Sequence, residues 1–135
     1  MEKITTEEAR NRIVERYRER VRKGELKELT GLDFNDYVSV FRNGSEVILL
    51  EYYQEEESLV DTLMKHKQEI LEQVEGGDNI LLQIITSNSH ELTIDDINEM
   101  SGFMDLLGND VNFHLGLETE DTSDFKVKME VYIMK

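Results

Sequence analysis

Residues 79–86 read NILLQIIT and residues 93–107 read TIDDINEMSGFMDLL, and these two neighbouring stretches decide the fold. The first is almost entirely apolar, which predicts a strand inside its sheet rather than at an edge. In the second, Thr93 can cap a helix whose first turn holds Asp95 and Asp96, at the positive end of the helix dipole. The apolar residues that follow at helical spacing are Ile97, Met100, Met104 and Leu107.

Strands and helices continue to alternate on both sides of this unit. Upstream, residues 47–53 predict a buried strand and residues 55–74 a helix that ends before two glycines. Downstream, residues 111–117 and 125–133 alternate apolar and polar side chains, as half-buried strands do. The polar positions of the last strand are Lys126, Lys128 and Glu130. The order predicts an α+β fold of two layers, a four-stranded mixed sheet with two helices on one face.

Residues 1–30 are expected to form a long helix that begins after Thr5 or Thr6. Its apolar stripe is narrow, so one side is expected to lie against another part of the protein and the rest to face water. The stripe consists of Ile13, Val14, Tyr17, Val21, Leu26 and Leu29.

Residues 31–44 fit two local structures. Asn43 and Gly44 lie between two apolar stretches, which is a hairpin signal. Alternatively, Asp33 caps a short helix that ends at Gly44. One face of that helix would hold Phe34, Tyr37, Val38 and Phe41. Periodicity alone does not decide between the two.

The composition excludes several classes of protein. The length of 135 residues predicts one domain, and the lack of cysteine excludes disulfides and thiol chemistry. No apolar stretch approaches the roughly 20 residues of a membrane helix, and the N-terminus does not read as a signal peptide. We therefore expect a soluble, cytoplasmic protein.

The charge is large and uneven. The net charge of −15 argues against nucleic acid and anionic lipid as partners, because binding phosphates needs clustered Lys and Arg. Residues 1–30 carry nine basic and seven acidic side chains, a net of +2, whereas residues 31–135 carry six and 23, a net of −17. This change indicates two structural units with a boundary near residue 30.

Motifs for cofactors are absent from the sequence. The eight glycines never cluster beyond one pair, so no phosphate-binding loop is present and nucleotide binding by this chain alone is not expected. His66, His90 and His114 lie 24 residues apart each time, a spacing that does not indicate a metal site.

One pair of carboxylates remains, in the stretch LDFNDYV at residues 32–38. Asp33 and Asp36 are three residues apart, so both would project from the first turn of the helical alternative. Helix capping alone explains them. Alternatively, they hold a water molecule or a cation against another molecule.

The stretch 32–38 resembles a loop of the bacterial tubulin homologue FtsZ, of the form N-x-D-F-A-D-V, which follows the long central helix. Residues 79–85 and 92–99 are similar to the strand and helix of the FtsZ C-terminal domain, where the helix typically opens L-T-L-x-E-V-N-E. Residues 111–116 and 125–131 match its last two strands in order and spacing.

The resemblance implies an FtsZ core helix at residues 1–30, a short helix at 34–43 and a C-terminal domain at 31–135, without the GTP-binding domain. In that family the acidic loop reaches into the nucleotide pocket of the neighbouring subunit and helps polarise the water that attacks GTP. Asp33 and Asp36 are then the expected catalytic residues.

Two departures from the family accompany this resemblance, since Gly31 replaces its asparagine and Asn35 its alanine. The partner implied is an FtsZ-like GTP-binding domain, or the next subunit of a cell-division polymer, and the GTP lies on that subunit. The alternative function is a stand-alone α/β protein-interaction module, which forms homo-oligomers or caps a partner polymer.

Overall fold

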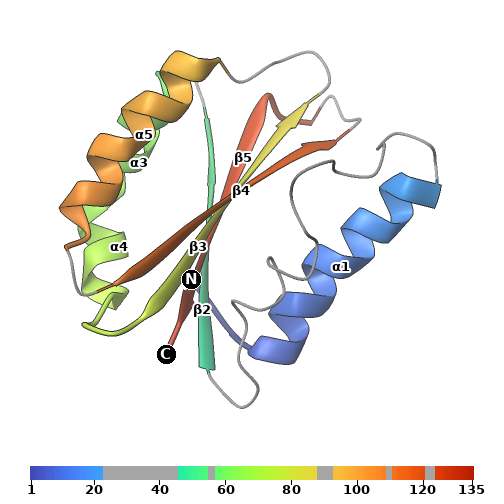
Figure 1. Cartoon of the computed structure of the whole chain (residues 1–135), viewed down its shortest axis with the longest axis horizontal. Coiled ribbons are helices and arrows are strands. Elements are labelled where there is room, and N and C mark those ends of the chain that lie inside the picture. The colour runs from blue at the N-terminus through green and yellow to red at the C-terminus, as the bar shows by residue number, and fades with distance from the viewer. Residues whose placement is uncertain (23–45, 55–56, 88–92, 109–110, 121–123) are drawn as a thin grey trace.

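The computed structural model describes residues 1–22, 46–54, 57–87, 93–108, 111–120 and 124–135. Strands and helices alternate along most of this part of the chain (Figure 1). In chain order they are β1 (Glu2–Thr5), α1 (Thr6–Arg22), β2 (Glu46–Tyr53), α3 (Leu59–Lys65), α4 (Lys67–Gln73), β3 (Asn79–Ser87), α5 (Ile94–Leu106), β4 (Asn112–Glu120) and β5 (Val127–Met134).

The sheet is mixed, as expected, but it has five strands instead of four, in the order β1-β2-β5-β3-β4. Strands β3 and β4 are parallel and the other neighbours are antiparallel. The additional strand is β1, which pairs with the start of β2 so that Ile4 lies opposite Val47. Both side chains are buried, so this pairing extends an apolar layer as well as the hydrogen-bonded ladder.

Helices cover both faces of the sheet (Figure 1). Helices α3, α4 and α5 lie on one face, where the larger apolar cluster is buried. Helix α1 lies on the opposite face over a smaller cluster. The expected helices on one face are confirmed, but the helix expected over residues 55–74 is divided at His66, which ends α3 and begins α4.

The N-terminal helix differs from the expectation in its start and its described length. Residues 2–5 belong to β1, and α1 spans 17 residues from Thr6 to Arg22. Thr5 caps it, since its Oγ1 accepts a hydrogen bond from the Glu8 N–H at 3.1 Å. The remainder of the segment 1–30 and the expected short helix at 34–43 lie outside the described residues.

The central unit agrees closely with its sequence. Strand β3 lies between β5 and β4, and eight of its nine residues are buried because helices cover both of its faces. Helix α5 begins with a capping box, in which Thr93 Oγ1 accepts from the Asp96 N–H at 3.1 Å and Asp96 Oδ2 accepts from the Thr93 N–H at 3.0 Å. None of the helices in the described segments is long and apolar enough to cross a membrane.

Candidate functional site: a buried charge cluster beneath helix α1

Asp33 and Asp36, the expected catalytic pair, lie outside the residues that the structure describes. Within the described part of the chain, the densest group of charges lies between α1 and the sheet. It joins α1 to strands β3, β4 and β5 through direct contacts between side chains. We call it the α1 charge cluster, and its members are Arg16, Gln83, Glu118, Lys128, Glu130 and Tyr132.

Arg16 is the centre of the α1 charge cluster. Its Nη2 lies 2.6 Å from Glu130 Oε1 on β5 and 2.9 Å from Glu118 Oε1 on β4. The exposed fraction of the side chain is 2% for Glu130, 11% for Glu118 and 23% for Arg16. One guanidinium group therefore neutralises carboxylates from two strands in a largely dry environment.

Neutral side chains also donate hydrogen bonds to these carboxylates. The Tyr132 hydroxyl donates to Glu130 Oε1 at 2.9 Å, and Gln83 Nε2 donates to Glu118 Oε1 at 2.6 Å. Tyr132 and Gln83 are almost fully buried. Each glutamate consequently has donors from two different elements, which fixes the position of its carboxylate.

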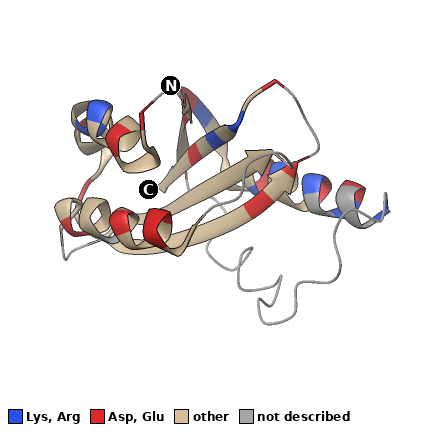
Figure 2. Ribbon diagram, turned by 90° about the horizontal axis from the view of Figure 1, so that it is seen from above, with Lys and Arg blue, Asp and Glu red and all other residues tan. Residues whose placement is uncertain are grey.

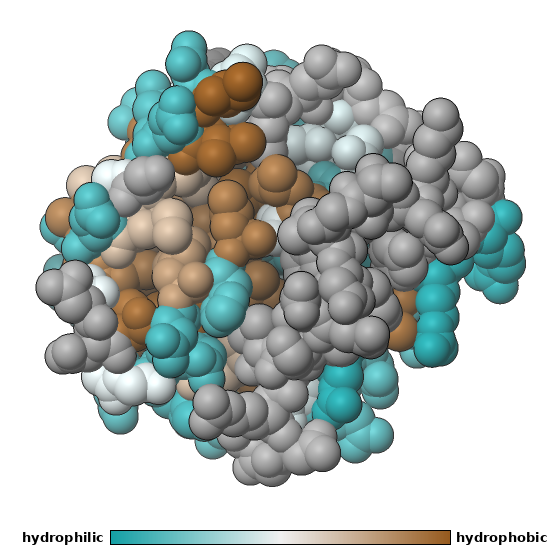
Figure 3. Space-filling view, in the orientation of Figure 1, coloured by the Kyte–Doolittle hydropathy of each residue, from teal (hydrophilic) through white to brown (hydrophobic). Residues whose placement is uncertain are grey.

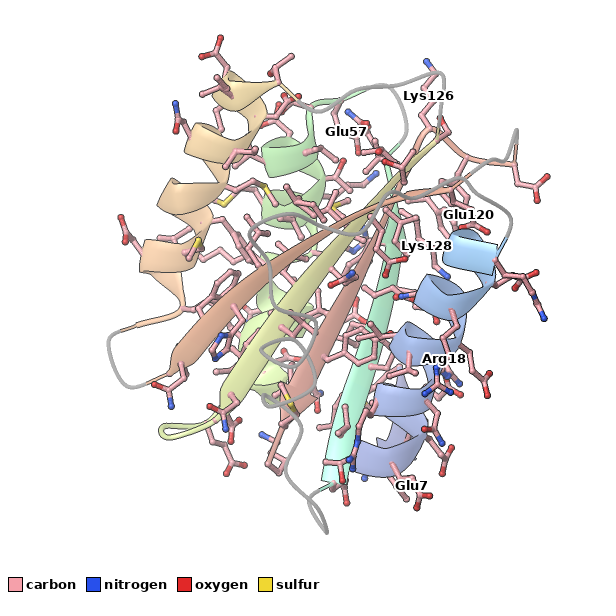
Figure 4. The ribbon with its side chains drawn as sticks, turned by 45° about the vertical axis from the view of Figure 1, so that its right-hand side comes forward. Glu7, Arg18, Glu57, Glu120, Lys126 and Lys128 are labelled. Atoms are coloured by element: carbon pink, nitrogen blue, oxygen red, sulfur yellow. The ribbon has the colours of Figure 1, made fainter. Side chains whose placement is uncertain are left out.

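Lys128 connects the cluster to further charges on β2 and α1. Lys128 Nζ lies 3.5 Å from Glu130 Oε2 and 3.5 Å from Glu51 Oε2 on β2. Arg12, one turn before Arg16 on α1, lies 2.9 Å from Glu2 and 3.8 Å from Glu51. Figure 4 shows Lys128 on the α1 side of the sheet, whereas Arg18 lies on the side of α1 turned away from it.

Burial and ion pairing act in opposite directions on these groups. Burial disfavours the charged form of Glu130, but the hydrogen bond from Arg16 and the positive charges of Arg16 and Lys128 outweigh it, so the pKa of Glu130 lies below its usual range. Burial would also lower the pKa of Arg16, yet its two glutamates raise it. Burial together with the charge of Glu130 raises the pKa of Tyr132. The ion pair is therefore charged at neutral pH.

This chemistry suits attachment better than catalysis. Glu130 is held ionised by fixed donors, so it is not poised to exchange a proton near neutral pH. Across the described segments, no group of three or more His, Asp or Glu side chains could hold a metal ion. The α1 charge cluster thus holds α1 in place on the sheet.

The alternating pattern of residues 125–133 placed Glu130 on the opposite face of the strand from its apolar residues, and the structure agrees, but that face is not exposed to water. Helix α1 covers that face, so Glu130 is buried beside the smaller apolar cluster. The signal available in the sequence was composition, because Glu130 is the one charged residue in the stretch MEVYIM at 129–134. An isolated charge in such a stretch indicates a buried ion pair.

The histidines are separate in the structure as far as it describes them. His66 lies at the junction of α3 and α4, where its ring stacks on Tyr52 with 4.1 Å between centroids. His114 is exposed on β4, and His90 lies outside the described residues. His66 therefore packs against the sheet as an aromatic side chain.

Comparison with known proteins gives a structural likeness alone. No protein-family model matches the chain, and no curated protein matches its sequence. Among solved structures, it is similar to a mutant FtsZ from M. jannaschii, with a TM-score of 0.54 and 16% sequence identity. The match covers 81% of this chain and 33% of that FtsZ, so the chain spans about a third of its length. The chain has the fold of part of an FtsZ/tubulin-like protein.

Proposed function

We propose that the chain is a polymer-interface domain of an FtsZ- or tubulin-like GTPase of the cytoplasm and serves cell division. In this proposal it binds no GTP itself and supplies Asp33 and Asp36 to the GTP of a neighbouring subunit. The observation that carries the proposal is the FtsZ-like fold over most of the chain, and the resemblance of the LDFNDYV stretch to the acidic loop of FtsZ supports it.

The chemical role of the two aspartates follows from their charge. A carboxylate that accepts a hydrogen bond from water orients and polarises that water for attack on the terminal phosphate of GTP. The nucleotide must come from the partner, because this sequence contains no glycine-rich phosphate loop. Catalysis would therefore require two molecules, with the nucleotide on one and the carboxylates on the other.

The α1 charge cluster supports the proposal because it attaches α1 firmly to the sheet. Helix α1 ends at Arg22, eleven positions before Asp33, and Arg16 fixes it to β4 and β5. A segment that must reach a neighbouring subunit benefits from rigid attachment at its base, since misplacement of catalytic groups is costly to the rate.

The test is GTP turnover by a GTP-binding domain of an FtsZ-like protein, measured with and without this chain. We expect the wild-type chain to stimulate turnover and Asp33→Asn or Asp36→Asn to reduce that stimulation by about tenfold or more. Asp61→Asn, at an exposed aspartate of α3, is the control and should stimulate like wild type. GTP hydrolysis by the chain alone, or full stimulation by both aspartate variants, would contradict the proposal.

A further inference from the structure

The boundary between α5 and β4 carries an apolar surface that the fold leaves partly uncovered. Figure 3 shows this area as brown and tan atoms that run from α5 across to β4. Ile94 is 77% exposed, which is unusual for isoleucine. The other members are partly exposed, and the whole α5–β4 surface consists of Ile94, Ile97, Met104, Phe113, Leu115 and Leu117.

These side chains belong to the edge of the apolar core. Phe113, Leu115 and Leu117 alternate along β4 on the face that packs against the helices, and each remains half-buried. On α5, Met100, Phe103 and Leu107 point into the core, whereas Ile97 and Met104 lie beside that buried stripe. The apolar area is thus continuous with the core and open to one side, as in grooves that accept an amphipathic segment.

The charges of helix α5 have one sign, and the exposed acid Asp105 directly follows Met104 of this surface. Helix α5 carries Asp95, Asp96, Glu99 and Asp105 and no Lys, Arg or His, and Figure 2 shows these acids along the helix. Two copies joined through this surface would bring the two α5 helices and their acids together, which is unfavourable. A partner with Lys or Arg beside its apolar residues would instead be attracted.

We propose that the α5–β4 surface binds an amphipathic segment of a partner protein, in which apolar side chains are flanked by Lys or Arg. The apolar side chains would cover the open edge of the core, and the basic ones would pair with the acids of α5. This binding is separate from Asp33 and Asp36 and does not require GTP, so it can hold whether or not the proposed function is correct.

The first experiment maps binding with a defined probe, a helical peptide composed of leucine on one face and lysine on the other. The backbone amide signals of the full chain are followed by NMR during titration. We expect the changes to concentrate in α5 and β4. The same peptide with glutamate in place of lysine should not bind, because it would repel α5.

Substitutions locate the contact. Ile94→Ser removes an exposed apolar side chain and Asp105→Lys reverses an exposed charge next to Met104, so neither should unfold the protein. Each is expected to weaken binding of the lysine peptide by about tenfold. The matched controls are Met64→Ser on α3 and Glu72→Lys on α4, at an exposed methionine and an exposed glutamate outside the surface, and both should bind like wild type.

Three results would overturn the inference. The first is that the amide changes fall outside α5 and β4, which would place the peptide elsewhere on an acidic protein. The second is that the controls weaken binding as much as Ile94→Ser and Asp105→Lys. The third is that the α5 and β4 signals change with protein concentration in the absence of peptide, which would make a second copy the occupant.

Discussion

Arg16 Nη2 lies 2.6 Å from Glu130 Oε1, although the two residues are 114 positions apart in the sequence. This contact joins the first helix to the last strand. Because Glu130 is buried, its carboxylate depends on Arg16 for neutralisation, and the loss of one partner leaves the other charge in an apolar environment.

Arg16→Met should therefore be strongly destabilising. The variant keeps the aliphatic bulk of the side chain but leaves Glu118 and Glu130 without their shared cation, so we expect the free energy of unfolding to fall by about 3 kcal/mol. Urea denaturation measures this change. Arg18→Met, on the exposed side of α1, is the control and should stay within about 0.5 kcal/mol of wild type. Equal stabilities of the two variants would show that the ion pair does not hold α1.

The stability should also fall in acid because of Glu130. The pKa of Glu130 is below its ordinary value of 4.5 in the folded protein, so the unfolded chain takes up its proton first as the pH decreases. The stabilisation is fully present above the ordinary value and is lost as the pH falls through the lower, folded value. Glu130→Gln should flatten this part of the stability curve, measured by urea denaturation from about pH 7 to about pH 3. If Glu130→Gln lost as much stability in acid as the wild-type protein, Glu130 would be excluded as the cause of that loss.

Thr93→Ala should destabilise the protein by about 1 kcal/mol, because the methyl group cannot accept the hydrogen bond from the Asp96 N–H. Thr93→Ser retains the hydroxyl and should remain close to wild type. Thermal unfolding of the two variants separates the contribution of the cap from that of general side-chain contacts. If serine destabilised as much as alanine, the capping box would not be the reason.

Lys135→Gln tests another ion pair, at the C-terminal end of β5. Lys135 Nζ lies 2.8 Å from Asp78 Oδ2 and also donates to the Gln73 carbonyl, so it connects the end of β5 to the turn between α4 and β3. Asp78 is buried, and we expect the loss of the charge to cost about 1–2 kcal/mol. Lys126→Gln, at an exposed lysine, should cost less than about 0.5 kcal/mol in the same thermal unfolding measurement. A similar loss in both variants would contradict a specific role for Lys135.

The elements that the sequence predicted correctly are those with a strong local pattern. Strand β3 has its apolar run and α5 has Thr93 before its acidic first turn, and both signals depend on neighbouring residues only. Strand β1 has the single apolar residue Ile4 between polar ones, and its conformation depends on pairing with β2, more than forty positions away. The residue pattern within one short segment does not indicate whether it pairs with a strand far away in the sequence.

The candidate site follows the same rule. Arg16, Glu118 and Glu130 come from three separate elements, and their meeting depends on where α1 lies on the sheet. The sequence suggested that α1 packs along one side but did not identify the face that it covers. Asp33 and Asp36 were proposed from the resemblance to FtsZ, and their role stays a prediction that the turnover measurement tests.

The position of β5 affects how the protein can form during synthesis. Strands β2 and β3 are not neighbours, because β5 lies between them and pairs with both. A ribosome completes β2 and β3 well before residues 127–134. During that time each strand exposes the backbone edge that will later pair with β5. Exposed apolar strand edges pair readily with other chains. We therefore expect the nascent chain to need protection until β5 emerges, and the β1–β2 and β3–β4 pairs to join into one sheet only at that late step.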